Sequence, residues 1–175
     1  MCSDLCCQTQ ERAEANLGLR YDAGAGYYSL VLAKFCNDQV LAVDGSAENV
    51  ERTRQNLARN DFPVTVIEGW IAATDDEDFV SLDRLALDYF FPDFIKMDIE
   101  GAEANALEGA TALLEQQRPN MVIEVHGRDV EAHCIRILES HGYTLLAVSP
   151  QAWLPEHRPN YDYNGWLICE GTKNN

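Results

Sequence analysis

Three carboxylates follow one lysine within a short segment of this chain, Lys96-Met97-Asp98-Ile99-Glu100-Gly101-Ala102-Glu103. An apolar approach, Phe94-Ile95, precedes the segment, and small apolar residues at helical spacing follow it. Acidic side chains at the end of a strand and the start of a helix are where open α/β sheets build their ligand sites. The segment therefore predicts a ligand site rather than only a solvated surface.

A second group of polar residues lies at the end of a later apolar run. Glu124 and His126 follow Met121-Val122-Ile123, where an unpaired buried carboxylate would be costly. Neighbouring parallel strands lie about 4.8 Å apart, so we expect Asp98, Glu124 and His126 to converge on one ligand. Two kinds of chemistry fit these side chains. Either they hold a divalent cation that orients a substrate hydroxyl, or His126 or Asp98 acts directly as a general base.

The other charged residues of the first segment are interpreted as structural. Lys96 and Asp98 point to the same side of a strand, so the ammonium is expected to neutralise a half-buried carboxylate. Glu100 and Glu103 stand where the next helix is predicted to begin, and a helix dipole favours negative charge there. We therefore predict that Glu100 and Glu103 serve the start of the helix.

These residues are positioned by an alternation of short apolar runs and helical stretches. The hydrophobic pattern predicts strands at Leu19–Ala23, Gln39–Val43, Pro63–Ile67, Asp93–Asp98, Asn120–Val125, Tyr143–Val148 and Gly165–Cys169. It predicts helices at Tyr27–Cys36, Ala47–Arg59 with Ser46 as N-cap, Ser81–Leu87, Gly101–Gln117 and Asp129–His141, and an acidic loop at Asp75–Asp78.

Strand and helix alternate until the fifth strand, which predicts an α/β fold. We expect a Rossmann-like, doubly wound, mostly parallel sheet of about seven strands, with an antiparallel edge strand formed by the final hairpin. A chain of 175 residues is expected to form a single domain. Within it we expect an N-terminal extension at 1–18, a core at 19–148 and an edge hairpin at 149–175.

Composition and charge restrict the classes of partner. The formal net charge is −16, and a field of this sign repels phosphate backbones, so we expect no nucleic-acid partner. No apolar run approaches the length of a membrane span, and the first residues lack the features of a signal peptide. The six cysteines show no zinc-binding spacing. A reducing cytoplasm is the predicted compartment.

A glycine-containing segment, Asp22-Ala23-Gly24-Ala25-Gly26, follows the first predicted strand and precedes a helix. Glycines in this place let the backbone approach a nucleotide ligand. Asp44 ends the second predicted strand, where an acidic residue usually accepts hydrogen bonds from ribose hydroxyls, and Gly45 follows it. The same residues also fit a tight turn with a helix-capping aspartate. Trp70 and Ile71, just after the third strand, fit either an adenine pocket or the core.

NAD and S-adenosylmethionine both fit this arrangement of glycines and Asp44. The third glycine of the dinucleotide fingerprint, which permits close packing near a pyrophosphate, is absent, and Tyr28 stands two residues after Gly26. S-adenosylmethionine has no pyrophosphate, and its sulfonium cation suits an acidic pocket. The pattern therefore favours S-adenosylmethionine over NAD.

Taken together, the motifs resemble those of the FkbM-type methyltransferases, a class I family that uses S-adenosylmethionine. The resemblance covers residues 19–148 and is most specific in the segment Lys96 to Glu103, which is similar to the family pattern K-x-D-x-E-G-x-E. Further similar segments are Val80-Ser81-Leu82-Asp83, Leu107-Glu108-Gly109-Ala110, Pro119 through His126, and His141-Gly142-Tyr143. The glycine segment is two residues shorter than the family pattern D-x-G-A-N-x-G-Y-x-S.

The resemblance implies an S-adenosylmethionine-dependent methyltransferase that methylates a hydroxyl of a small molecule or saccharide. The residues expected to bind the cofactor are Asp22, Gly24, Ala25, Gly26, Asp44, Gly45, Trp70 and Ile71. The residues expected to face the acceptor are Asp98, Glu124 and His126. These three side chains also offer ligand atoms for a divalent cation. The shortened glycine segment keeps a second hypothesis open, a non-catalytic relative with a degraded cofactor loop. An NAD-dependent oxidoreductase is the third.

Overall fold

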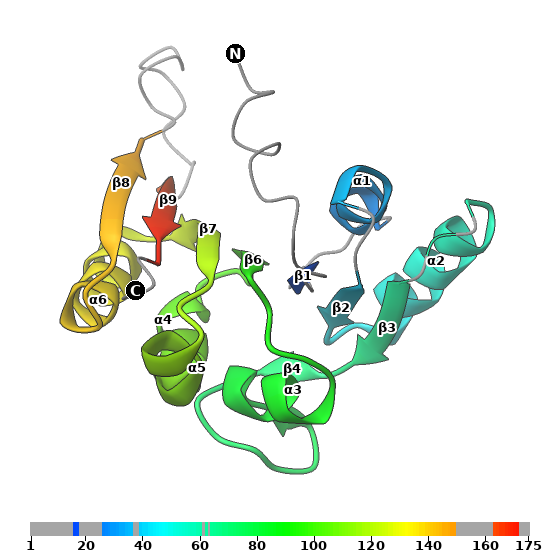
Figure 1. The fold of residues 1–175 in the computed structure, drawn as a ribbon, viewed down its shortest axis with the longest axis horizontal. Helices are drawn as coiled ribbons and strands as arrows, with labels where there is room; N and C mark the ends of the chain where they lie inside the picture. Colours follow the sequence, from blue (N-terminus) through cyan, green and yellow to red (C-terminus); the bar gives the residue numbers. More distant parts are fainter. Residues whose placement is uncertain are drawn as a thin grey trace.

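The computed structural model describes residues 16–17, 26–36, 39–60, 62, 64–149 and 163–171 of the chain (Figure 1). Among these residues, seven strands form one sheet in the order β3-β2-β1-β6-β7-β9-β8. The strands are β1 (Asn16–Leu17), β2 (Val40–Asp44), β3 (Val64–Glu68), β6 (Phe94–Asp98), β7 (Asn120–His126), β8 (Thr144–Val148) and β9 (Asn164–Glu170). The order reverses between β1 and β6, which makes that boundary a topological switch point.

The predicted α/β class and the mostly parallel pairing are confirmed. β1, β2, β3, β6 and β7 pair in parallel, whereas β9 is antiparallel to both β7 and β8. The final hairpin does lie at one edge of the sheet, as predicted. However, β9, the strand that is antiparallel to its neighbours, lies between β7 and β8. The strand at this edge of the sheet is therefore β8.

The helices form two groups at different ends of the sheet (Figure 1). α1 (Tyr27–Cys36) and α2 (Ala47–Ala58) contact β2 and β3, whereas α4 (Glu103–Glu108) and α6 (Arg128–Ser140) contact β7 and each other. α3 (Leu82–Asp88) contacts α5 (Thr111–Gln116). The predicted cap of α2 is confirmed, because the Ser46 hydroxyl accepts a hydrogen bond from the amide of Asn49.

The prediction of one helix at Gly101–Gln117 was wrong, because Gly109 and Ala110 separate α4 from α5. At Gly109 the helix packs directly against backbone of another segment. A Cβ there would collide with the carbonyl oxygen of Ala72 and lie 3.0 Å from the Cα of Ala73. The carboxylate of Asp83 then caps α5, accepting hydrogen bonds from the amides of residues 112 and 113 at 2.9 and 2.8 Å.

Two further differences concern strands. The predicted first strand, Leu19–Ala23, lies outside the described residues, and β1 at Asn16–Leu17 falls inside the segment predicted as an extension. β4 (Trp70–Ile71) and β5 (Phe79–Val80) form a separate parallel pair around the predicted acidic loop. Two-residue strands are too short to produce a recognisable alternation of apolar and polar residues.

The hydrophobic core lies between the sheet and the helices α3 to α6. Its most completely buried large side chains include Leu41, Leu82, Ile95, Leu107, Leu113, Leu114, Met121 and Ile123. Cys134 and Cys169 are buried free thiols within it. Within the described part of the chain, no helix has the length and apolar character needed to cross a membrane.

Candidate active site at the carboxyl ends of β6 and β7

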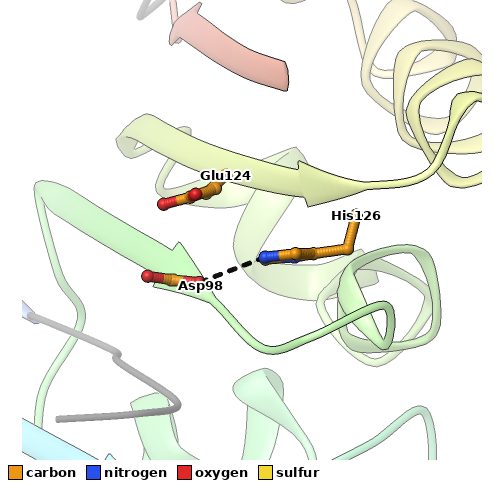
Figure 2. A group of neighbouring side chains, drawn as sticks. All are labelled: Asp98, Glu124 and His126. Carbon is orange, nitrogen blue, oxygen red and sulfur yellow. Dashed lines mark ion pairs between the residues drawn. The ribbon is translucent and has the colours of Figure 1, made fainter. Parts of the chain in front are cut away.

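The structure brings together Asp98, Glu124 and His126, as the sequence predicted (Figure 2). Asp98 is the last residue of β6 and lies in register with Glu124 of β7, and His126 ends β7 two residues later on the same side. One ligand atom from each side chain lies within 4.8 Å of the others. The parallel pairing of β6 and β7 is therefore what assembles the cluster.

Asp98 is buried and is held by two neighbours. Lys96 Nζ lies 3.3 Å from its Oδ2, and His126 Nε2 lies 3.7 Å from its Oδ1. The predicted neutralising role of Lys96 is confirmed by this contact. The ammonium also lies between two aromatic rings, 5.4 Å from the centroid of Tyr28 and 4.9 Å from that of Trp166. Such cation–π contacts stabilise a desolvated ammonium.

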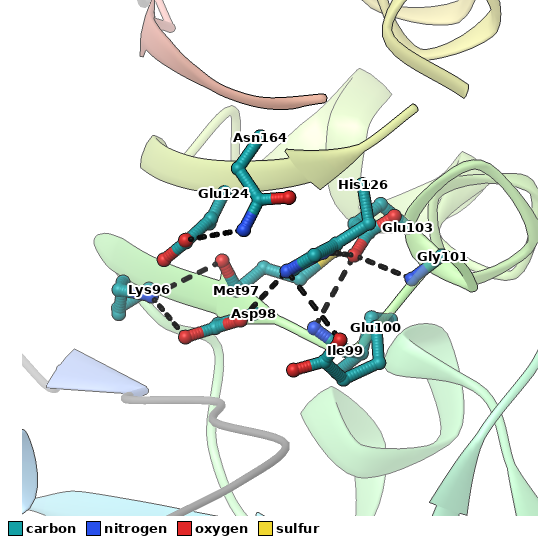
Figure 3. Close-up of polar contacts among 10 residues, drawn as sticks. All are labelled: Lys96, Met97, Asp98, Ile99, Glu100, Gly101, Glu103, Glu124, His126 and Asn164. Carbon is teal, nitrogen blue, oxygen red and sulfur yellow. Dashed lines mark hydrogen bonds and ion pairs between the residues drawn. The ribbon is translucent and has the colours of Figure 1, made fainter. Parts of the chain in front are cut away.

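Glu103 has a larger role than the sequence predicted (Figure 3). Its Oε1 accepts hydrogen bonds from the amides of Ile99 and Gly101, so it does organise the start of α4. The same oxygen lies 2.8 Å from Nδ1 of His126, and Glu103 is fully buried. One sequence signal for this position exists: Glu103 lies on the apolar stripe of its helix with Ala106 and Leu107, where a charge needs a partner.

The surroundings of the cluster raise the pKa values of two of its members. Burial is the main reason that the pKa of Glu124 lies above its usual value, and the nearby charge of Asp98 adds to it. Burial alone lowers the pKa of His126, but the hydrogen bond to Glu103 and the surrounding carboxylates outweigh this effect. The pKa of His126 is therefore raised, and the site favours a positive charge.

Part of the predicted cofactor surface lies beside this cluster, at the other side of the switch point. Gly26 is buried with a φ of +72°, and a Cβ there would lie 2.9 Å from Thr53 Cγ2, so both conformation and space require glycine. Asp44 is buried at the end of β2, and its Oδ1 accepts a hydrogen bond from the amide of Ser46 at 2.8 Å. Asp22, Gly24 and Ala25 lie outside the described residues.

Gly45 and Trp70 form a close-packed pair next to Asp44. A Cβ at Gly45 would collide with the indole of Trp70, which is 43% exposed. An exposed indole beside an acidic strand end fits the base and ribose of a nucleoside. Ile71 is buried in the hydrophobic core, which is one of the two placements predicted for it. Gly26, Asp44, Gly45 and Trp70 are thus compatible with a nucleoside cofactor.

The chain belongs to the FkbM methyltransferase domain family, whose model matches residues 36–145, more than half of the chain. It is therefore a member of an S-adenosylmethionine-dependent methyltransferase family. No curated protein sequence matches it.

Solved structures share the methyltransferase fold. The FkbM methyltransferase of Methylobacillus flagellatus is 18% identical with a TM-score of 0.64, over 92% of this chain and 45% of that one. A precorrin-6y C5,15-methyltransferase from Geobacter metallireducens is 15% identical with a TM-score of 0.59, over 91% and 81%. An rRNA methylase from Streptococcus thermophilus is 14% identical with a TM-score of 0.59, over 91% and 89%. At these identities the likeness concerns the fold.

Proposed function

We propose that this protein transfers a methyl group from S-adenosylmethionine to a hydroxyl oxygen of a small molecule or saccharide. The observation that carries the proposal is the cluster of Asp98, Glu124 and His126, which lies across the β1/β6 switch point from Gly26 and Asp44. Ligands of open α/β sheets bind at this place. The net charge of −16 supports a small acceptor rather than a nucleic acid.

The cofactor, when bound, supplies a methyl group on a positively charged sulfur. Asp44 would hold the ribose, Trp70 would pack against the base, and the backbone at Gly26 would allow close approach of the nucleoside. Methyl transfer is an in-line displacement, so the main task of the protein is to place the acceptor oxygen behind the methyl carbon. Removal of the hydroxyl proton makes that oxygen a better nucleophile.

The geometry favours a divalent cation as the group that activates the hydroxyl. Two carboxylates and one imidazole present ligand atoms within 4.8 Å of one another, and they come from two rigid strands. Carboxylate and imidazole ligands suit Mn²⁺ and Zn²⁺, and carboxylates suit Mg²⁺. A cation bound there would lower the pKa of a coordinated hydroxyl.

A specific observation also supports direct general-base catalysis by His126. Its ring is hydrogen-bonded to Glu103 through Nδ1, which leaves Nε2 to face the cluster. A base oriented by a carboxylate is a common catalytic arrangement. The methyltransferase activity of chelator-treated protein distinguishes the two routes. If the activity is lost completely and is restored by Mg²⁺ or Mn²⁺, the result supports a cation. If the activity is unchanged, the result supports His126 as the base.

Cofactor binding is the first test of the enzyme proposal. Isothermal titration calorimetry with S-adenosylmethionine and S-adenosylhomocysteine is expected to show that both compounds bind. Asp44→Ala is expected to weaken this binding. Asp78→Ala is the control and is expected to keep it, because Asp78 is an exposed acidic residue of the β4–β5 loop. No binding of either compound at millimolar concentration would contradict the enzyme proposal and support the non-catalytic alternative. Stabilisation by NADH but not by S-adenosylhomocysteine would support an oxidoreductase instead.

The acceptor class is tested with a panel of saccharides and hydroxylated small molecules, together with an RNA control. Methyl transfer from labelled S-adenosylmethionine to a member of the hydroxyl panel is the expected result. Labelling of the RNA alone would contradict the proposed acceptor class while leaving the methyltransferase activity intact.

A further inference from the structure

The segment between β6 and α4 folds back on itself in a way that delivers Glu103 to the active site. Glu100 has a φ of +50° and Gly101 a φ of +101°, so two successive residues adopt left-handed backbone conformations. A left-handed Glu is uncommon and costs free energy, whereas glycine tolerates this region. The reversal places the side chain of Glu103 next to the backbone amide of Ile99, just after β6, and next to His126 of β7 (Figure 3).

One carboxylate oxygen of Glu103 accepts hydrogen bonds from three donors. The amides of Ile99 and Gly101 lie 3.3 and 3.0 Å from Oε1, and Nδ1 of His126 lies 2.8 Å from it. These donors compensate the cost of burying the carboxylate completely. The other oxygen, Oε2, is buried and has no hydrogen-bond partner among the described residues. The orientation of Glu103 is therefore fixed by its loop, independently of any ligand.

This contact determines the protonation pattern of the imidazole. A carboxylate that already accepts two amide hydrogen bonds can only accept from His126, so we assign the ring hydrogen to Nδ1. In the neutral ring the lone pair is then on Nε2. That atom lies 3.7 Å from both Asp98 Oδ1 and Glu100 Oε2, on the side of the cluster. The ring thus turns its basic nitrogen toward the place proposed for the acceptor.

We propose that Glu103 is a positioning residue that fixes the Nδ1–H tautomer and the ring orientation of His126, so that Nε2 serves the reacting hydroxyl. The same requirement holds whether Nε2 takes a proton or binds a cation, because either task uses its lone pair. The catalytic part of this inference rests on the proposed function. The tautomer part concerns the protein alone.

The tautomer is measured by ¹⁵N and ¹H NMR of the histidine rings, at a pH where the His126 imidazole is neutral and without cofactor or metal. The wild-type protein is expected to show a protonated Nδ1 and an unprotonated Nε2. The Glu103→Gln variant keeps the size of the side chain and an acceptor oxygen but removes the charge. It is expected to contain a larger fraction of the Nε2–H tautomer.

Glu108→Gln is the matched control. Glu108 is on the same helix and also contacts a histidine, with Oε1 3.3 Å from Nε2 of His133, but both side chains are largely exposed. Under assay conditions Glu103→Gln is expected to lower kcat about 10- to 100-fold, the size typical of residues that orient a functional histidine, with little change in the KM for S-adenosylmethionine. Glu108→Gln is expected to retain wild-type kcat and the wild-type ring spectrum of His126.

Each result decides the inference. An Nε2–H tautomer in the wild-type protein would overturn it, and this measurement remains decisive even if Glu103→Gln does not fold. A folded Glu103→Gln protein with a wild-type tautomer and kcat would overturn it as well. A changed tautomer with unchanged kcat would overturn the catalytic part. If the wild-type protein transfers no methyl group, the proposed function fails while the tautomer result still stands.

Discussion

At the scale of single residues, Lys96 is the cation that lies next to the buried carboxylate of Asp98. Both side chains are almost fully buried, and the ammonium lies 3.3 Å from Oδ2. Lys96→Met leaves a buried carboxylate without this partner, so we expect the free energy of unfolding at pH 7 to fall by about 3 kcal/mol. Urea denaturation measures the change.

The exposed ion pair between Arg84 and Asp88 provides the control for that experiment. Its atoms are closer, at 2.6 Å, but both side chains are exposed. Arg84→Met is expected to leave stability nearly unchanged, because solvent screens an exposed ion pair. Equal losses in the two variants would show that burial does not determine the contribution of Lys96.

A second prediction at the residue scale concerns Glu124 and pH. Its pKa in the folded protein is raised above the usual 4.5, so the native state binds this proton more tightly than the unfolded state does. Stability from this group is complete below pH 4.5 and is lost as pH rises through the folded pKa. In metal-free buffer, wild-type protein is therefore expected to lose stability relative to Glu124→Gln as the pH rises above 4.5.

Denaturation of the wild-type and Glu124→Gln proteins at several pH values in this range measures the difference between their free energies of unfolding. A difference that stays constant, or that grows in favour of the wild type, would contradict the raised pKa of Glu124. The expected result also means that the ionised side chain of Glu124 lowers the stability of the folded protein.

The sequence was sufficient to predict that three side chains of the site meet, but not how each of them is held. Asp98, Glu124 and His126 could be predicted to converge because strand ends in a parallel sheet share one edge. The contact between Glu103 and His126 could not, because it depends on the left-handed conformations at residues 100 and 101. Local pattern alone assigned Glu103 to the helix start, which is only half of its role.

At the scale of secondary-structure elements, Gly109 determines where α4 ends. Its φ is −84°, a conformation open to any residue, so the requirement for glycine comes from space alone. A Cβ would collide with backbone at Ala72 and approach Ser81 Cβ to 3.1 Å. We expect Gly109→Ala to lower the free energy of unfolding by about 1 to 3 kcal/mol through overpacking.

Gly69→Ala is the control, since its Cβ would make an ordinary contact of 3.5 Å with Val80. Its effect is expected to stay within about 1 kcal/mol. Thermal denaturation of both variants measures the difference. A larger loss for Gly69→Ala than for Gly109→Ala would contradict the close packing of Gly109 against Ala72 and Ser81.

Element prediction succeeded where the signal is local and failed where it is not. The position of α1 follows from the periodicity of its apolar residues. The cap of α2 follows from Ser46, which stands four residues before the buried Val50. The break between α4 and α5 depends instead on Asp83, which caps α5 from a distant part of the sequence. No window of neighbouring residues contains that information.

At the scale of the whole molecule, the reactivity of the buried thiols indicates whether the protein is folded or unfolded. Burial raises the pKa of both Cys134 and Cys169 to about 12, so at pH 8 neither forms an appreciable fraction of thiolate. We expect iodoacetamide to leave both residues unmodified in the native protein and to modify both once urea unfolds it. Site-resolved mass spectrometry measures the labelling of each. Rapid modification of either thiol without denaturant would contradict the buried contact of α6 with the sheet.

The insertion of β9 between β7 and β8 also has a consequence for biosynthesis. In the described sheet β8 hydrogen-bonds to β9, which follows it in the chain and is therefore translated later. A nascent chain that has emerged only as far as residue 163 holds Thr144–Val148 without this neighbour, and the side chains of Leu146 and Val148 face outward even in the finished fold. That interval is when an unpaired, partly apolar strand is open to chaperones or to pairing with another chain.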